Sequence, residues 1–185
     1  MSWNSSLVLI RTAALGQPVA HDWVMEIAPV VLVDVQEVVP AAQEAVASVN
    51  RDCADVLADV EVHHIGATSL PFGHTKGDVD VNVRVDEAQF PIVVAALGER
   101  FAIAQPENWS PTFASFSAAG YMLPLGIQVT VIGSDNDFLL ALRDRMRADP
   151  ALLRQYDGLK VAAASKGADA YWKAKNEMLQ ALLAK

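Results

Sequence analysis

The segment that decides the fold of this chain is Ile65-Gly66-Ala67-Thr68-Ser69, followed by Asp78-Val79-Asp80-Val81-Asn82-Val83. Successive side chains of a β-strand point to opposite faces, so Asp78 and Asp80 share one face and the valines enter a core on the other. Two carboxylates held this close repel each other unless a cation lies between them. Mg²⁺ takes such a pair when it also binds substrate phosphates. The pattern therefore predicts an acid-bearing strand and half of a metal site.

The small residues that follow Ile65 predict a tight turn whose backbone N–H groups can approach a phosphate. Lys76 lies two residues before Asp78 and could reach a triphosphate as a point charge, although a salt bridge to Asp78 is an equally simple interpretation. The acidic pair also has a plain alternative, because carboxylates at the start of a strand often serve as solvated edge residues. The predicted nucleotide-binding residues here are Gly66, Ala67, Thr68, Ser69 and Lys76.

These motifs resemble the signature of the nucleotidyltransferase superfamily, in which an apolar residue, a Gly and a small residue precede an apolar-flanked Asp-x-Asp. A closer resemblance is to the GrpB family of small proteins with a predicted nucleotidyltransferase fold. The matching residues are His64-Ile65-Gly66-Ala67-Thr68-Ser69-Leu70-Pro71, Lys76, Leu142-Arg143-Asp144-Arg145-Met146-Arg147-Ala148-Asp149-Pro150, Tyr156, Leu159-Lys160, Tyr171 and Lys175.

The resemblance implies an α+β fold with a small mixed β-sheet flanked by helices, over residues 29–185, and leaves residues 1–28 as an N-terminal extension of unknown role. It also implies a Mg²⁺-dependent transfer of a nucleoside monophosphate from a nucleoside triphosphate to an unknown small acceptor or protein side chain. Asp78 and Asp80 would be the catalytic and metal-binding residues.

The chain departs from these patterns in ways that affect the expected chemistry. Ala67 replaces the usual Ser, although Thr68 and Ser69 lie next to it. An ungapped alignment to GrpB places Asp80 on the family's Asp and Asn82 two residues beyond it, whereas the superfamily spacing favours Asp78 with Asp80.

The third carboxylate of active nucleotidyltransferases is not apparent in the sequence. The corresponding strand is predicted at Gly126-Ile127-Gln128-Val129-Thr130-Val131-Ile132, which contains no acid. Gln128 can accept a hydrogen bond but cannot act as a base. An alternative therefore stays open, in which the chain is a catalytically degenerate nucleotide-binding or protein-interaction module of the same fold.

Two further pairs of residues have both structural and functional interpretations. His63 and His64 point to opposite sides of a strand, and one of them is expected to order the Gly66 turn, with a substrate contact as the alternative for His64. Arg143 and Arg147 lie one helical turn apart and share a face. Their predicted partner is a nucleotide phosphate or an internal carboxylate such as Asp78 or Asp144.

Composition limits the remaining function classes. The chain has 185 residues, 52% apolar and 19% charged, which is typical of one folded domain. Its net charge of −8 favours a small substrate or a protein partner over a nucleic acid. No apolar run is long enough to span a membrane, and the first residues lack the basic character of a secretory signal. With Cys53 as its one cysteine, the chain is predicted to be cytoplasmic.

Hydrophobic periodicity and turn residues predict the order of elements. Helices are expected over residues 40–57, 88–97, 136–148, 150–156 and 167–183, the first with Pro40 at its start. Strands are expected over residues 30–34, 61–65, 78–85, 114–117 and 127–132.

Overall fold

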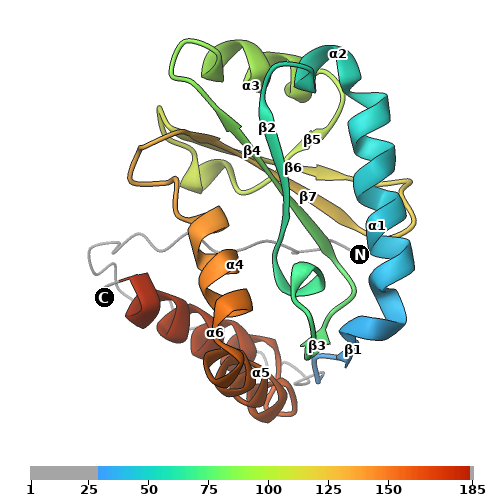
Figure 1. Cartoon of the computed structure of the whole chain (residues 1–185), viewed down its shortest axis with the longest axis vertical. Helices are drawn as coiled ribbons and strands as arrows, with labels where there is room; N and C mark the ends of the chain where they lie inside the picture. The colour runs from blue at the N-terminus through green and yellow to red at the C-terminus, as the bar shows by residue number, and fades with distance from the viewer. Residues whose placement is uncertain (1–28, 184–185) are drawn as a thin grey trace, which may run out of the picture.

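The computed structural model describes residues 29–183, so the predicted extension of residues 1–28 lies outside the described part. The elements follow one another in this order (Figure 1): β1 (Val33–Asp34), α1 (Val35–Asp52), α2 (Ala54–Leu57), β2 (Glu61–Ile65), the 3₁₀ turn η1 (Ala67–Ser69), β3 (His74–Thr75), β4 (Val79–Val85), α3 (Phe90–Gly98), β5 (Ala102–Ile103), the 3₁₀ turn η2 (Pro106–Asn108), β6 (Phe113–Ala118), β7 (Leu125–Val131), α4 (Leu139–Ala148), α5 (Pro150–Ala164) and α6 (Ala168–Leu183).

A five-stranded mixed sheet forms the centre of the fold, with the strand order β2-β4-β7-β6-β5. β4 and β7 are parallel neighbours, and the other adjacent pairs are antiparallel. A parallel pair needs a long crossover, which α3, β5 and β6 supply here. A separate two-stranded pairing joins β1 to β3. The predicted α+β class with a small mixed sheet flanked by helices is confirmed.

The two faces of the sheet differ sharply in polarity because strand side chains alternate. The face toward α1 and α3 is apolar and buried; its β4 and β7 side chains are Val79, Val81, Val83, Val85, Leu125, Ile127, Val129 and Val131. The opposite face carries Asp80, Asn82 and Arg84 from β4, together with Gln128 and Thr130 from β7. The alternation predicted for the acid-bearing strand is therefore confirmed for residues 79–85, whereas Asp78, predicted as its first residue, lies just before β4.

The first helix begins earlier than Pro40, where the sequence predicted its start. α1 begins at Val35 because the side chain of Asp34 accepts a hydrogen bond from the Gln36 backbone N–H at 2.8 Å and caps the helix. Pro40 lies inside this helix, one turn beyond its first residue. The predicted single helix also divides at Cys53, where the backbone leaves helical geometry and α2 begins.

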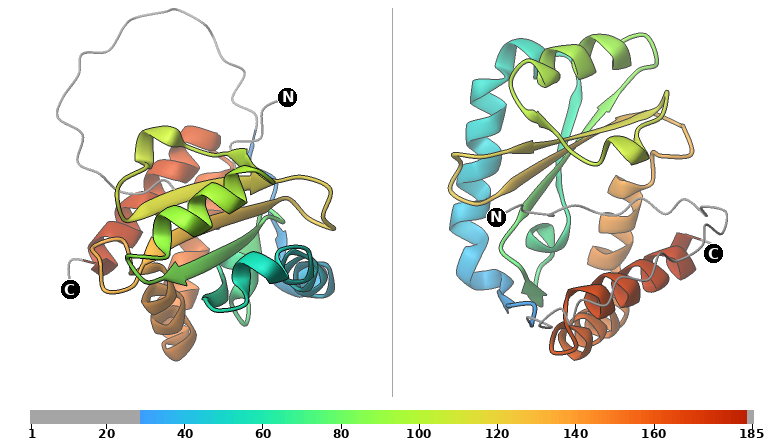
Figure 2. Two further views of the ribbon diagram at one scale, coloured as in Figure 1. Left: turned by 90° about the horizontal axis from the view of Figure 1, so that it is seen from above. Right: turned by 180° about the vertical axis from the view of Figure 1, so that it is seen from behind.

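The C-terminal helices α4, α5 and α6 form a second packed unit with the segment that follows η1. Their shared apolar cluster consists of Leu70, Leu142, Met146, Leu153, Tyr156, Leu179 and Leu182. α5 continues to Ala164, well beyond the predicted end at residue 156. Figures 1 and 2 show α5 and α6 at the end of the molecule where β1 and β3 lie. None of the helices within residues 29–183 has the length and apolar character needed to cross a membrane.

Candidate functional site

Asp80 is the most confined carboxylate of the polar sheet face, with 7% of the residue exposed. Glycines flank it on both neighbouring segments. A Cβ atom added at Gly66 would lie 2.3 Å from Asp80 Oδ2, and one added at Gly126 would lie 3.1 Å from Oδ1. Gly66 also has a φ of +72°, in the region that favours glycine. The turn after β2 can approach the acid strand this closely only because no side chain intervenes.

The surroundings of Asp80 shift its protonation toward neutral pH. Burial is the main cause that raises the pKa of Asp80, to about 6, and repulsion from Asp78 adds to it. Attraction to Lys175 and Lys76, and a hydrogen bond from Gln128, act in the opposite direction. The two carboxylates are therefore close enough to interact, as the spacing predicted, and the protein's own cations relieve only part of their repulsion.

Lys76 lies beside the acidic pair and realises the salt bridge that the sequence left as one alternative. Its Nζ is 3.3 Å from Asp78 Oδ2. The same ammonium group lies 4.4 Å from the ring centroid of Trp172, and Nζ of Lys175 lies 4.9 Å from that centroid. Sequence analysis did not assign Trp172 or Lys175 to the site. Trp172-Lys173-Ala174-Lys175 is distant in the chain, and only the packing of α6 brings it here.

Hydrogen bonds inside the Gly66 turn use the hydroxyl groups that were predicted to face a phosphate. Thr68 Oγ1 donates to the carbonyl oxygen of Asp78 at 3.1 Å and lies 3.0 Å from His64 Nε2. Ser69 Oγ donates to the carbonyl oxygen of Gly66 at 2.7 Å. His64 is thus the histidine that orders the turn, as predicted. Burial, with repulsion from nearby arginines, lowers the pKa of His64 to about 4.

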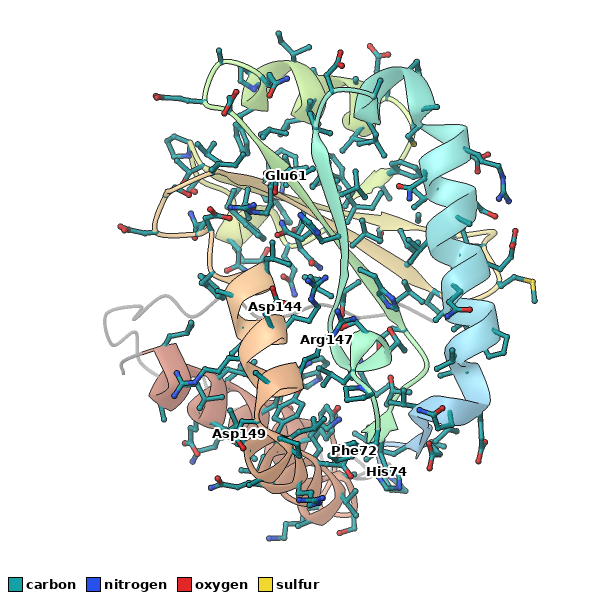
Figure 3. The ribbon with its side chains drawn as sticks, viewed as in Figure 1. Glu61, Phe72, His74, Asp144, Arg147 and Asp149 are labelled. Atoms are coloured by element: carbon teal, nitrogen blue, oxygen red, sulfur yellow. The ribbon has the colours of Figure 1, made fainter. Side chains whose placement is uncertain are left out.

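Arg143 and Arg147 on α4 bind the backbone of the same turn. Arg143 Nη1 donates to the carbonyl oxygen of His64 at 3.0 Å, and its Nη2 pairs with Asp144 at 2.7 Å. Arg147 donates from Nε and Nη2 to the carbonyl oxygen of Ser69, at 3.1 and 2.6 Å. Figure 3 shows Arg147 between α4 and η1. These contacts place both arginines behind the turn, where they fix its shape, and nucleotide binding by them stays a prediction.

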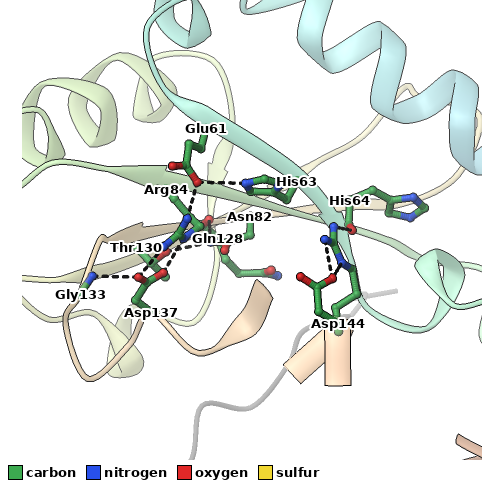
Figure 4. A network of polar contacts seen from close by, with 11 residues as sticks. Glu61, His63, His64, Asn82, Arg84, Gln128, Thr130, Gly133, Asp137 and Asp144 are labelled. Carbon is green, nitrogen blue, oxygen red and sulfur yellow. Dashed lines mark hydrogen bonds and ion pairs between the residues drawn. The ribbon is translucent and has the colours of Figure 1, made fainter. Parts of the chain in front are cut away.

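Gln128 and Asn82 face each other across the parallel pair β4–β7. Gln128 Nε2 donates to Asp80 Oδ1 at 3.1 Å, and Asn82 Nδ2 donates to the Gln128 carbonyl oxygen at 3.1 Å and to Thr130 Oγ1 at 2.9 Å. Figure 4 shows Asn82, Gln128 and Thr130 within this polar face. Gln128 Oε1 and Asn82 Oδ1 are nearly inaccessible to solvent. Neither oxygen has a hydrogen-bond partner among the described residues.

A separate ion-pair group holds the neighbouring part of this polar face. Arg84 bonds to Asp137 at 2.6 and 2.7 Å and also contacts Glu61, which in turn lies 3.1 Å from His63 (Figure 4). Asp137 also accepts a hydrogen bond from the Gly133 backbone N–H. Each charged side chain of this group has an oppositely charged partner within it. The group is therefore a structural link between β2, β4 and the loop before α4.

The segment that carries Lys76 is held in place by α5. The His74 backbone N–H and Nδ1 bond to the Asp157 carboxylate at 2.6 and 2.9 Å. Lys160, 1% exposed, donates to the His74 carbonyl oxygen and has its Nζ 3.6 Å from Asp157. Burial lowers the pKa of Lys160 to about 8. This contact explains how the short strand β3 and the loop to β4 keep one position.

The oxygen donors present fit a Mg²⁺ ion that also binds substrate. Asp80 on β4 and Asp78 just before that strand supply two carboxylates, and the unpaired buried oxygen of Gln128 belongs to the amide that contacts Asp80. Mg²⁺ commonly takes one or two carboxylates and completes its shell with phosphates and water. Within residues 29–183 no group of three or more His, Cys, Asp or Glu side chains is arranged to hold a metal. Substrate oxygens would have to complete the site.

Comparisons with known proteins agree with this architecture. The family model described as GrpB protein matches residues 29–185. A UPF0157 protein of Vibrio cholerae serotype O1 is 24% identical over 132 residues, which cover 71% of this chain and 70% of that relative. The crystal structure of the conserved protein GrpB from Enterococcus faecalis superposes with a TM-score of 0.60 at 20% identity, covering 83% of this chain and 99% of the other. At this identity, the structural likeness shows the fold alone.

Proposed function

The chain belongs to the GrpB family, and from this premise and the geometry around Asp80 we propose that it is a magnesium-dependent nucleotidyltransferase. The observation that carries the proposal is the closure of the Gly66 turn onto Asp80, with Asp78 beside it. Two carboxylates next to a turn of small residues place oxygen donors and backbone N–H groups together. A metal–triphosphate needs both kinds of group.

In the proposed reaction, an acceptor hydroxyl oxygen forms a bond to the α-phosphorus of a nucleoside triphosphate. The bond from that phosphorus to the bridging oxygen breaks, and pyrophosphate leaves with the electron pair. Mg²⁺ would neutralise the charge of the phosphate oxygens when it is bound by Asp78 and Asp80. The hydroxyl proton would go to water or to Asp80, since Gln128 cannot take it.

The substrates are proposed as a nucleoside triphosphate and a small molecule or protein side chain. The net charge of −8 supports this choice, because a protein that neutralises many nucleic-acid phosphates carries a basic surface. A cytoplasmic location is proposed with it, where nucleoside triphosphates are abundant. The free, buried thiol of Cys53 is compatible with that reducing environment.

A second candidate function is nucleotide binding without chemistry. Gln128 favours it, because this residue occupies the strand next to Asp80 and donates a hydrogen bond where an active enzyme would need a proton acceptor. A related alternative is a protein-interaction module of the same fold, which would neither bind a nucleotide nor catalyse a reaction. Binding and transfer therefore have to be measured separately.

The test is a calorimetric titration of ATP, GTP, CTP and UTP with and without Mg²⁺, on the wild type and on the double variant Asp78→Asn/Asp80→Asn. Binding that needs Mg²⁺ and disappears in the double variant is the expected result. Glu44→Gln/Asp55→Asn, which removes two exposed carboxylates elsewhere, is the matched control and should bind like the wild type.

Transfer is measured next with the nucleotide that binds, labelled at the α-phosphate, by following pyrophosphate release and label incorporation in a cell extract depleted of this protein. Pyrophosphate release that depends on Asp80 supports the transferase. Metal-dependent binding without release supports the second candidate. If no nucleoside triphosphate binds, both proposals are wrong.

A further inference from the structure

Two lysines share one tryptophan ring next to the acidic pair. Nζ of Lys76 and Nζ of Lys175 lie 4.4 and 4.9 Å from the ring centroid of Trp172. Lys76 comes from the loop before β4 and Lys175 from α6, so elements almost a hundred residues apart converge on this ring. Each ammonium group gains from the electron-rich ring, and the two positive charges are held close together.

Lys175 is the less satisfied of the two. The residue is 8% exposed, and among residues 29–183 it has no carboxylate within ion-pair distance, whereas Lys76 pairs with Asp78. The Lys175 side chain is thus largely covered by protein, while its ammonium group forms no ion pair within the described residues. Attraction to Asp80 acts on Lys175 without a direct ion pair, so a bound anion would be its direct partner.

Neighbouring charges confirm that this region is crowded with cations. Repulsion from Lys175 contributes to the lowered pKa of Lys160, whose own contacts go to Asp157 and the His74 carbonyl oxygen. Lys160 is therefore satisfied inside the protein. Lys76 and Lys175 remain as the cations at the carboxylate pair that a bound anion could contact.

We propose that Lys76, Trp172 and Lys175 form a polyphosphate clamp that binds the terminal phosphates of the nucleotide. This inference rests on the proposed function, since it names the group that the same site recognises. Trp172 positions the two ammonium groups and does not stack on a base. The clamp favours a triphosphate over a monophosphate, because a triphosphate carries more negative charge and has enough phosphate oxygens to contact both ammonium groups and a metal ion at once.

The clamp also couples metal binding to phosphate binding. Asp78 and Asp80 carry two negative charges, and Lys76 and Lys175 carry two positive charges. The lysines therefore weaken the binding of a divalent cation that binds alone. They strengthen the binding of a divalent cation that arrives together with a polyphosphate. Removing Lys175 should change the two affinities in opposite directions, which a lysine with a purely structural role would not do.

The experiment uses inorganic tripolyphosphate as the probe, in calorimetric titrations of the full chain with and without Mg²⁺, and inorganic phosphate for comparison. Lys175→Met should weaken tripolyphosphate binding by about tenfold or more, the loss typical of one charge-assisted hydrogen bond. Lys175→Arg should restore part of it. Lys173→Met is the control, since Lys173 lies on the same helix, is 76% exposed in its side chain and faces Glu177.

Three further readouts separate the clamp from a structural role. Mn²⁺ alone, measured by titration, should bind Lys175→Met more tightly than the wild type. The melting temperature of Lys175→Met without ligand should change little, because the lost attraction to Asp80 and contact with Trp172 are offset by a smaller desolvation cost. Inorganic phosphate should bind the wild type much more weakly than tripolyphosphate does.

Unchanged tripolyphosphate affinity in Lys175→Met, or no binding of tripolyphosphate to the wild type, would overturn the clamp. A lowered melting temperature with both affinities unchanged would assign Lys175 to the fold alone and would also overturn it. Lys175-dependent binding of tripolyphosphate without nucleotide transfer would support the clamp and count against the transferase. The two proposals therefore fail on different results.

Discussion

Arg147 on α4 donates two hydrogen bonds to a single backbone oxygen, that of Ser69, at 3.1 Å from Nε and 2.6 Å from Nη2. The carbonyl belongs to the last residue of η1, the turn that closes onto Asp80. Arg143 binds the His64 carbonyl oxygen just before the same turn. The C-terminal helices thus hold the candidate phosphate-binding turn from behind through its backbone, whatever its side chains are.

Replacement of Arg147 by methionine should lower the free energy of unfolding by about 1–3 kcal/mol, because a partly buried carbonyl loses a charged donor. Urea denaturation measures this change. Arg51→Met is the control, since Arg51 forms an exposed pair with Glu44 and should change stability by less than about 0.5 kcal/mol. Equal effects of the two substitutions would show that the contact to Ser69 does not stabilise the turn.

Replacement of Gly66 by alanine should be more damaging than the same change at another glycine with positive φ. The new Cβ atom would lie 2.3 Å from Asp80 Oδ2, so either the turn or the acid strand has to move. Gly120 has a φ of +92° and no atom within 4 Å of an added Cβ, which makes Gly120→Ala a control for backbone strain alone. We expect Gly66→Ala to cost about 1–3 kcal/mol beyond the control.

The same two variants distinguish an effect on metal binding at the candidate site from an effect on the stability of the fold. Thermal melting gives the stability difference, and Mn²⁺ titration gives the effect on the carboxylates. Loss of metal binding in Gly66→Ala with binding retained in Gly120→Ala is expected. If both variants have the same melting temperature and the same affinity for Mn²⁺, the close approach of Gly66 to Asp80 has no energetic consequence in solution.

His64 should make stability depend on pH in the acidic range. Its pKa is about 4 in the folded chain, below its ordinary value of 6.5, so the unfolded chain binds more protons between these values. Stability is therefore fully present above about pH 6.5 and falls as the pH decreases toward 4. Relative to His64→Gln, the wild type should lose roughly 2–3 kcal/mol over this interval.

Denaturant titrations at pH 7, 5.5 and 4 measure the difference between these two proteins. Gln89→Ala is the control, because Gln89 has no titratable side chain, and its difference from the wild type should not vary with pH. A constant difference between the wild type and His64→Gln across the series would contradict a neutral, buried imidazole at the turn.

Replacement of Gln128 by glutamate would place a third carboxylate beside Asp80. Without metal the variant should be less stable than the wild type, because a further negative charge is buried next to Asp78 and Asp80. Mg²⁺ should then raise its melting temperature more than it raises that of the wild type. Gln128→Met controls for the lost hydrogen bond to Asp80 without adding charge. An equal response of all three proteins to Mg²⁺ would show that this position does not face a metal site.

The sequence alone contained enough to predict the acid-bearing strand and the turn before it. Valines alternating with polar residues from 79 to 85 fit only a strand with one buried face, and β4 has that arrangement. Gly66 among small residues predicted a tight turn, and Gly66 has the positive φ of +72° that such a turn uses. Local chemistry determines such features, because neighbours along the chain impose them.

Features that depend on distant segments were predicted less well. Asp34 caps α1 six residues before Pro40, and the sequence pattern did not show which of these two residues starts the helix. Gln128 and Asn82 were singled out in the sequence, but only the parallel register of β4 and β7 places their amides opposite each other beside Asp80. Strand pairing across the crossover cannot be read from either strand by itself.

What the sequence determined by itself is therefore the pair of carboxylates, the turn and the face they share, because strand periodicity and glycine geometry are local. Only the tertiary structure decided what surrounds them. The packing of α6 brings Lys175 and Trp172 to Lys76, and that of α4 turns Arg147 toward the backbone of η1. Such contacts arise because helices far along the chain bury their apolar faces against the rest of the fold. No local sequence pattern specifies which polar side chains this packing places next to the carboxylates.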